Sequence, residues 1–385
     1  MPSPRVCSPL LLALVVVMCA TGLVRLAAAG EERITPVLQS VPSPPVAFPG
    51  SDGRTHLVYE LWLWNASGGD AHIESVEVLG DGQPLLALDR AAIAGRLRPS
   101  GTLASSVQGL LFLHMALPPG AATPRQLTHQ VAVRALAAPP GQQDIRSTGG
   151  ETPVDVHEPV VIGPPLRGER FISADGCCDA VRHTRAALPV NGRLRVAQRF
   201  AVDWEQLDDS GRLYSGPRGS LHSYTIYGRE ALAVADARVA SVVDGRPEQT
   251  PGRYPEGISL EEADGNSVIL NLGGGRYALY AHLQPGSLRV KAGDRVARGQ
   301  VLGLVGNSGN SVAPHLHFHV MDGPSALDAN GLPYLLDAFV ITGASPGTEA
   351  FDHAEAEGTP LAIQPVTPPR RVTRAHPLDQ QILSF

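Results

Sequence analysis

Polar and apolar side chains alternate strictly in APHLHFHV, residues 313–320. In a β-strand this alternation places His315, His317 and His319 on one face and the apolar residues between them on the other. Neutral imidazole is a preferred zinc ligand, and three imidazoles on one face are typical of a metal cleft. The pattern therefore predicts a strand that binds metal, although a histidine-rich surface strand would show the same spacing.

Three further motifs precede this strand along the chain. They are YALYAHL at residues 277–283, GDRVARGQ at residues 293–300 and GNSGNS at residues 306–311. With the HLH of residues 315–317, their kind and order resemble the catalytic core of the M23 (LytM-like) zinc metallopeptidases. The resemblance covers roughly residues 200–322. It implies an open two-layer β structure that holds zinc in a groove.

The same resemblance implies roles for the histidines of these motifs. His317 is expected to be a zinc ligand. His315 and His282 are expected to be the active-site histidines that handle the catalytic water and the transition-state oxyanion. His319 matches no family position, so we expect it either to pack in the core or to orient a metal ligand through a hydrogen bond.

The remaining ligands depart from the family pattern, in which a histidine stands four residues before an aspartate. Asp203 matches the aspartate, but Arg199 occupies the place of the histidine. We expect His183 to replace it, displaced by a hairpin with the two-residue turn Asn191-Gly192. A regular hairpin register would point His183 and Asp203 to opposite faces, so this assignment needs a bulge or a break. His222 is the alternative ligand, and a metal-free site is the other alternative.

The expected ligand set implies a reaction as well as a cofactor. Two histidines and one aspartate hold Zn²⁺ with one position open for water. The resemblance therefore implies a zinc-dependent endopeptidase that hydrolyses peptide cross-links or stem peptides of peptidoglycan. The alternative is a zinc-free M23-like regulatory protein that binds the cell wall or activates another wall hydrolase as its partner. A biotinyl or lipoyl carrier shares the GDRVARGQ pattern, but its modifiable lysine would be Lys291, which does not stand at a hairpin tip.

Composition and turn signals predict an all-β protein. The 41 glycines and 34 prolines favour turns and short strands, and a net charge of −6 gives no sign of a nucleic-acid partner. Short apolar runs between turn clusters favour an N-terminal immunoglobulin-like sandwich, and low hydrophobicity favours a linker after it. The expected parts are the sandwich at residues 33–136, the linker at 137–153, the M23-like peptidase domain at 155–343, and a Pro-rich tail at 344–385, extended or mobile, with a terminal strand at 381–385.

The N-terminus predicts export. Arg5 precedes an uncharged apolar stretch from Leu10 to Val24, and small residues follow at 27–29. This stretch of about 15 residues is short for a membrane span of about 20, but it is typical of a signal peptide. We expect residues 1–29 to be removed, so that the mature protein has no membrane span and lies in the periplasm, outside the cell or in the cell wall. An uncleaved anchor is the alternative.

Only two cysteines, Cys177 and Cys178, remain after the expected cleavage. Export would place them in an oxidising compartment, where a disulfide between the two neighbours is possible but strained. Two adjacent thiolates do not make the usual four-ligand structural zinc site. We expect no catalytic role for them.

Overall fold

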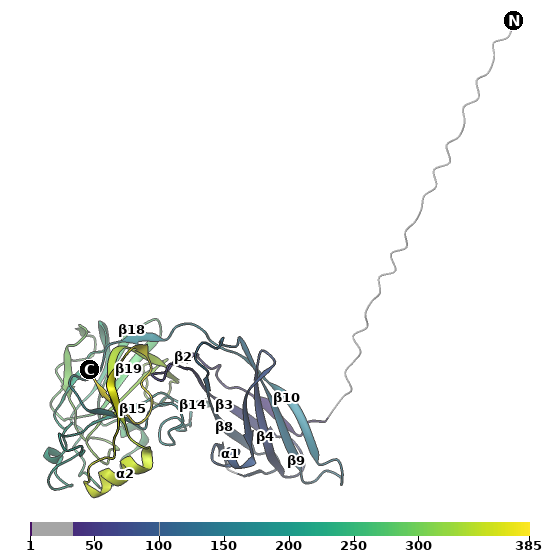
Figure 1. Ribbon diagram of the computed structural model, residues 1–385, viewed down its shortest axis with the longest axis horizontal. Coiled ribbons are helices and arrows are strands. Elements are labelled where there is room, and N and C mark those ends of the chain that lie inside the picture. Colours follow the sequence, from purple (N-terminus) through teal and green to yellow (C-terminus); the bar gives the residue numbers. More distant parts are fainter. Residues whose placement is uncertain (2–33, 100) are drawn as a thin grey trace. The chain divides into compact units, whose positions relative to one another are not determined.

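The structure is a computed structural model that describes Met1, residues 34–99 and residues 101–385. Residues 35–385 form one compact unit built almost wholly of β-strands (Figure 1). The all-β class predicted from the sequence is therefore confirmed. The expected signal peptide lies, apart from Met1, outside the described residues. No described helix has the length and apolar character needed to cross a membrane.

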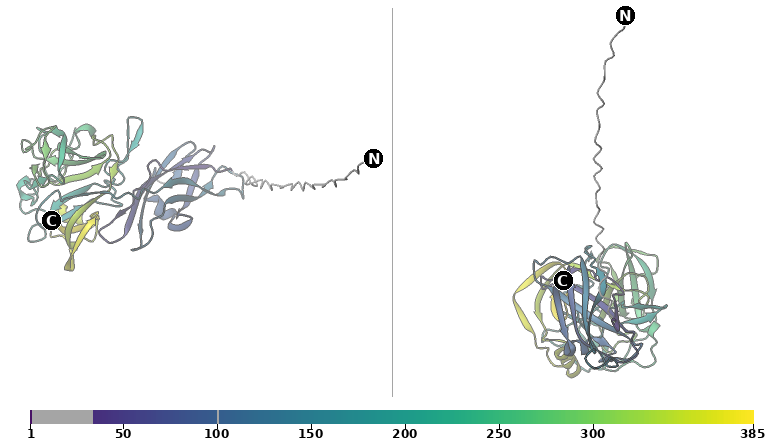
Figure 2. Two further views of the ribbon diagram at one scale, coloured as in Figure 1. Left: turned by 90° about the horizontal axis from the view of Figure 1, so that it is seen from above. Right: turned by 90° about the vertical axis from the view of Figure 1, so that its right-hand side faces the viewer.

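Two antiparallel sheets enclose one core between residues 37 and 153, the part of the chain coloured purple to blue in Figure 2. The first has the order β1-β3-β8-β6 with β2 beside β3, and the second has the order β10-β9-β4-β5 with β7 beside β4. Leu61 of β3 and Val76 of β4 are fully buried in this shared core. The two-layer arrangement agrees with the expected sandwich. The elements are β1 (Val37–Ser40), β2 (Phe48–Pro49), β3 (Thr55–Asn65), β4 (Ala71–Gly80), β5 (Gln83–Asp89), α1 (Arg90–Ala94), β6 (Leu97–Arg98), β7 (Thr102–Leu103), β8 (Gln108–Leu117), β9 (Gln126–Ala135) and β10 (Asp144–Pro153).

The segment expected to be a linker contains a strand. β10 occupies residues 144–153 and pairs with β9. Most of its side chains are exposed or half-buried, so backbone hydrogen bonds at the edge of the sheet hold it in place. Low hydrophobicity, which favoured a linker, does not exclude a strand, because backbone pairing does not require apolar side chains. The domain boundaries stay predictions.

The rest of the chain is organised around a 12-stranded sheet. Its order is β11-β24-β26-β12-β15-β22-β19-β18-β17-β20, with β23 beside β22 and β25 beside β24. Leu316, Phe318 and Val320 of β22 are fully buried, as the alternation predicted. The strands of this sheet are β11 (Val160–Ile162), β12 (Phe171–Ala174), β15 (Val202–Gln206), β17 (Ala237–Val243), β18 (Asn266–Gly273), β19 (Arg276–Leu283), β20 (Arg295–Val296), β22 (Leu316–Met321), β23 (Gly331–Leu332), β24 (Tyr334–Ala344), β25 (Gln364–Ala375) and β26 (Gln381–Ser384). Smaller elements are the pair β13 (Leu188–Val190) and β14 (Arg193–Arg195), the pair β16 (Glu230–Leu232) and β21 (Val301–Leu304), and the 3₁₀-helices η1 (Leu221–Ser223) and η2 (Leu260–Glu262).

The C-terminal tail forms regular structure, contrary to the prediction of an extended or mobile segment. α2 (Thr348–Glu357) buries Phe351 and Ala354, and β25 pairs with β24. The prolines of β25 are compatible with a strand because β25 lies off the main path of the sheet, beside β24 alone. The predicted terminal strand is confirmed as β26, which pairs with both β12 and β24.

Candidate metal centre

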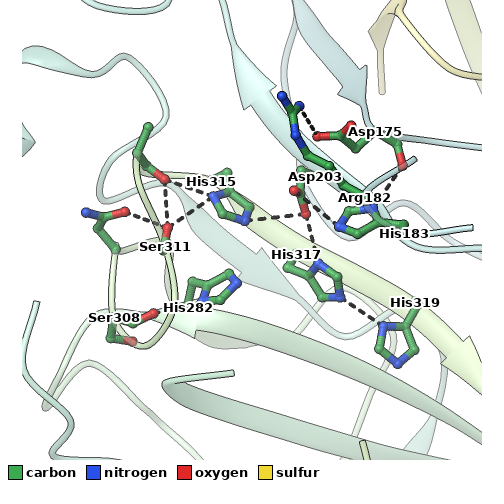
Figure 3. A network of polar contacts seen from close by, with 12 residues as sticks. Asp175, Arg182, His183, Asp203, His282, Ser308, Ser311, His315, His317 and His319 are labelled. Atoms are coloured by element: carbon green, nitrogen blue, oxygen red, sulfur yellow. Dashed lines mark hydrogen bonds and ion pairs between the residues drawn. The ribbon is translucent and has the colours of Figure 1, made fainter. Parts of the chain in front are cut away.

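Strand register brings the histidine-rich strand beside two strands that carry other polar residues. β22 lies between β15 and β19. His317 of β22 stands opposite Asp203 of β15 on one side and opposite Ala281 of β19 on the other. His282 follows Ala281 directly, so three neighbouring strands bring Asp203, His282 and His317 to one place (Figure 3).

His183, Asp203 and His317 form the first cluster at this place. The Nδ1 atom of His317 lies 2.8 Å from Oδ1 of Asp203, and the Nε2 atom of His183 lies 3.4 Å from Oδ2 of the same carboxylate. One ligand atom from each of the three residues lies within 4.8 Å of the others. Two nitrogens and a carboxylate oxygen at this spacing are the donors of many catalytic zinc sites.

Both His183 and His317 make a hydrogen bond through the ring nitrogen that points away from Asp203. This leaves the other nitrogen of each ring available to a metal. Nδ1 of His183 lies 2.8 Å from the backbone carbonyl oxygen of Asp175, so it carries the proton and leaves the lone pair on Nε2. Nε2 of His317 lies 3.0 Å from Nδ1 of His319. A proton on Nε2 of His317 leaves its Nδ1 free to bind a metal. Second partners of this kind orient metal-binding histidines, so the residues present suit zinc.

His183 is placed beside Asp203 by a turn and not by the pairing of a regular hairpin. β13 and β14 pair in the regular two-residue register, with Val190 opposite Arg193, and the pairing ends at Arg195. His183 lies before this hairpin in a turn in which the N–H of Thr184 donates to the carbonyl of Ala180. The hairpin is therefore broken rather than bulged, which was one of the two conditions for placing His183 beside Asp203.

Arg199, which stands where the family pattern has histidine, is engaged elsewhere. Its guanidinium Nη2 and Nε lie 2.6 and 2.9 Å from the carboxylate of Glu60 on β3. The two residues are 6% and 1% exposed, so this is a buried bidentate ion pair. Arg199 is thereby held by the N-terminal sandwich, and His183 takes the place beside Asp203.

A second cluster joins His282 and His315 to His317, with ligand atoms within 4.8 Å of one another. Nδ1 of His282 lies 2.7 Å from the carbonyl oxygen of Ser308, and Nδ1 of His315 lies 2.8 Å from that of Ala313. Both Nδ1 atoms therefore carry protons, and in the neutral rings both Nε2 atoms are proton acceptors. His282 has a φ of 61°, an uncommon value that is often found at functional sites.

Burial and neighbouring groups shift the pKa values of this site. Burial, together with the nearby His315 and His317, lowers the pKa of His282 well below its ordinary value. Burial alone would raise the pKa of Asp203, but His183 and His315 hold that pKa well below its ordinary value. Asp203 is therefore an ionised carboxylate, which is the form that binds a metal.

A cavity of about 430 Å³ opens over the two clusters. Its walls include segments that the sequence reasoning missed, in particular Phe351, Asp352 and Glu355 of α2. The Ala- and Glu-rich composition of residues 348–357 was a helix signal in the sequence. Nothing in the sequence indicated that this helix would lie against the histidines.

The model of the family described as "Peptidase family M23" matches residues 224–329. This segment is an M23-family domain. It supplies His282, His315 and His317, while His183 and Asp203 come from residues before the match. The family resemblance stated from the four motifs is therefore confirmed for this part of the chain.

Relatives of the M23 domain include peptidases of known activity and structure. Peptidoglycan DD-endopeptidase ShyA of Vibrio cholerae is 40% identical over 57 residues, which are 15% of this chain and 13% of ShyA. The chain thus matches only a small part of ShyA. The catalytic domain of lysostaphin from Staphylococcus simulans is 21% identical, with a TM-score of 0.24, over 42% of this chain and 88% of that domain. A zinc-containing peptidase from Vibrio cholerae is 16% identical, with a TM-score of 0.21, over 71% of this chain and 81% of that peptidase.

Other candidates from the sequence lie apart from the M23 site. His222, the alternative ligand, lies in η1 with its ring against Tyr227, and it belongs to none of the clusters found among the described residues. Cys177 and Cys178 form a disulfide with each other. Cys178 also lies near His56 and His114, but its sulfur is already bonded. His319 is fully buried and lies within hydrogen-bond distance of His317, so it both packs and contacts a residue of the two clusters.

Proposed function

We propose that the chain is a zinc-dependent M23 endopeptidase that hydrolyses peptide cross-links or stem peptides of peptidoglycan. The observation that carries this proposal is the convergence of His183 Nε2, the Asp203 carboxylate and His317 Nδ1 beneath a cavity. The M23 match supports a peptidase, and the name of the ShyA relative supports peptidoglycan as the substrate.

Each residue of the site has a role in this proposal. His183, Asp203 and His317 hold the metal. Zinc, when bound, polarises a carbonyl group and acidifies water. His315 accepts a proton at Nε2, which lies 3.4 Å from Oδ1 of Asp203, while its Nδ1 is held by the carbonyl of Ala313. The bond from Nδ1 of His282 to Ser308 fixes the ring and turns Nε2 towards the site. Burial disfavours the protonated ring, but negative charge that develops on the substrate would favour it, so that Nε2 would then donate a hydrogen bond to that charge.

Peptidoglycan as substrate would place the mature chain outside the cytoplasm. We propose export through residues 1–29 to the periplasm or the cell wall, with the sandwich of residues 33–136 and the peptidase domain of residues 155–343 as two domains within the one compact unit. The disulfide between Cys177 and Cys178 supports an oxidising compartment.

Digestion of purified peptidoglycan tests this function. Wild-type protein is expected to release fragments with new amine ends, identified by mass, and a chelator is expected to abolish this release until zinc is restored. Asp203→Ala is expected to be inactive, and His222→Ala, which alters an exposed histidine outside the clusters, is the matched control. Unchanged fragments in all conditions, together with the absence of bound zinc, would favour the zinc-free regulatory protein instead.

A further inference from the structure

A second group of metal-binding residue types lies apart from the candidate metal centre. His56, His114 and Cys178 each offer one ligand atom, and these atoms lie within 4.8 Å of one another. None of the three falls within residues 224–329, so the M23 match does not account for them. The group joins distant parts of the chain, because the histidines come from β3 and β8 and Cys178 precedes the turn that carries His183.

The register of β3 and β8 brings the two histidines together. His56 stands opposite Ala116, and His114 stands opposite Val58. The Nδ1 atom of His56 lies 3.0 Å from Nε2 of His114. The Nε2 atom of His56 lies 3.0 Å from Oδ1 of Asp52, so it carries the proton, and in the neutral ring the lone pair of Nδ1 faces His114. A carboxylate behind a histidine in this way orients metal-binding imidazoles.

His114 is also in the form that binds metal. Burial, together with the nearby His56, lowers the pKa of His114 to about 4, so its ring is neutral near pH 7. A hydrogen bond between the two ring nitrogens needs a proton on one of them, and a metal ion can replace that proton. The candidate metal centre has a contact of the same kind, between Nδ1 of His317 and Oδ1 of Asp203 at 2.8 Å.

The third ligand atom is held in a disulfide. The Sγ atom of Cys178 lies 3.7 Å from Nδ1 of His56, but it is bonded to Cys177. The thiolate is the form of cysteine that binds a metal, so Cys178 becomes a ligand only after reduction. A second cavity, of about 560 Å³, is lined by both Cys178 and His114. This cavity gives a reductant and a metal ion a path to the group.

We propose that His56, His114 and Cys178 bind zinc when the disulfide between Cys177 and Cys178 is reduced. A dithiol supplies the two electrons and becomes a disulfide, while each cysteine sulfur takes up one proton. The thiol of Cys178 then releases its proton to solvent as the thiolate binds zinc. Two imidazoles and one thiolate leave the fourth position of tetrahedral zinc to water from the cavity. Magnesium and calcium ions fit poorly because they prefer oxygen ligands.

Two substitutions that remove the same disulfide test this site in the full-length chain. Cys177→Ser leaves Cys178 free beside the histidines. Cys178→Ser leaves Cys177, which belongs to no metal-binding group found among the described residues. Each protein, kept reduced by a trialkylphosphine without oxygen, is titrated with cobalt and separately with zinc. A thiolate bound to cobalt gives an intense near-ultraviolet band, which imidazole and carboxylate ligands do not.

Cys177→Ser and reduced wild-type protein are expected to show this band and to bind one equivalent of zinc more than oxidised wild-type protein. Cys178→Ser and His114→Ala are expected to show neither change, while His157→Ala, at an exposed position, keeps both. Asp52→Asn, which alters the acceptor behind His56, is expected to lower the zinc affinity of this site by about 10–100-fold.

The cobalt band separates this site from the proposed peptidase centre, which has no thiolate. Asp203→Ala is therefore expected to keep the band although it abolishes peptidoglycan cleavage. Equal zinc content and equal cobalt spectra for Cys177→Ser and Cys178→Ser would overturn the proposal. Circular dichroism reports folding, and unfolding of both Cys177→Ser and reduced wild-type protein would also overturn it, because the fold must hold the three ligands without the disulfide.

Discussion

The two halves of the candidate metal centre are built in opposite ways. The late half is β22, a regular strand that presents His317 by alternation and is paired on both sides. The early half runs from Asp175 to Asp203 and presents His183 from a turn. The Nδ1 atom of His183 is held by a hydrogen bond to the carbonyl of Asp175. A strand holds a ligand in place through backbone hydrogen bonds with its neighbouring strands. A turn lacks such pairing and depends on contacts with distant parts of the chain.

The distant support of the early half comes from the N-terminal sandwich and the C-terminal tail. Arg199 is tied to Glu60, which lies 139 positions earlier in the chain. The ring of Phe200 packs edge-on against Phe48, at 5.3 Å between centroids, and against His376, at 5.9 Å. Substitutions far from the metal should therefore disturb the position of His183 in the early half, but not the position of His317 in the late half.

Removal of a metal ligand from the late half should have the largest effect on zinc binding and activity. His317→Ala is expected to lose zinc and to lower kcat/KM on peptidoglycan peptides by about a thousandfold or more, because the metal contributes several kcal/mol to catalysis. Zinc content and kinetics check this. His353→Ala, at an exposed position on α2, is the control. Stoichiometric zinc in His317→Ala would contradict the assignment.

The ion pair that supports the early half predicts a large loss of stability. Arg199→Ala leaves Glu60 buried without its partner, so the free energy of unfolding is expected to fall by about 3–5 kcal/mol. Denaturant titration measures this. Arg193→Ala, at an exposed position of the neighbouring hairpin, should change stability by less than about 0.5 kcal/mol. Equal effects of the two substitutions would show that the early half does not depend on the sandwich.

The contact of His376 with the early half predicts sensitivity to acid. Burial lowers the pKa of His376 to about 4, whereas an unfolded histidine has a pKa near 6.5. Between these values the unfolded chain binds a proton that the folded chain does not, so stability falls as the pH falls. The contribution is complete above pH ~6.5 and is lost towards pH ~4, a change of up to about 3 kcal/mol.

His376→Phe tests this directly. The variant is expected to reduce the slope of unfolding free energy against pH by about one proton in that window. Denaturation at a series of pH values provides the slope. A slope identical to that of the wild-type protein would show that His376 does not contribute to the acid sensitivity.

The smallest effect on zinc binding is expected at His319, which supports His317 of the late half. Its Nδ1 accepts the hydrogen bond of His317, and its Nε2 is buried with no partner among the described residues. His319→Phe should lower zinc affinity by about 10–100-fold, the usual cost of removing such an orienting group. Competition with a chelator measures the affinity. An unchanged affinity would leave His319 as a packing residue only.

The same contrast explains what the sequence could predict. Alternation in residues 313–320 was sufficient for β22 and its apolar face, and Asp203 followed from the motif order. The turn that carries His183 has no periodicity, and the break in its hairpin is a tertiary event, so the sequence left the first ligand open between His183 and His222. β10 and β25 were missed because edge strands are held by backbone pairing. The place of α2 beside the cavity depends on long-range packing that local composition does not encode.

Anomalous diffraction at the zinc edge, on crystals of the zinc-loaded chain, tests whether His183, Asp203 and His317 share one metal ion. We expect one strong peak at about 2.0–2.2 Å from His183 Nε2, His317 Nδ1 and an Asp203 carboxylate oxygen. The absence of a peak there, or a zinc ion that His183 does not touch, would contradict it.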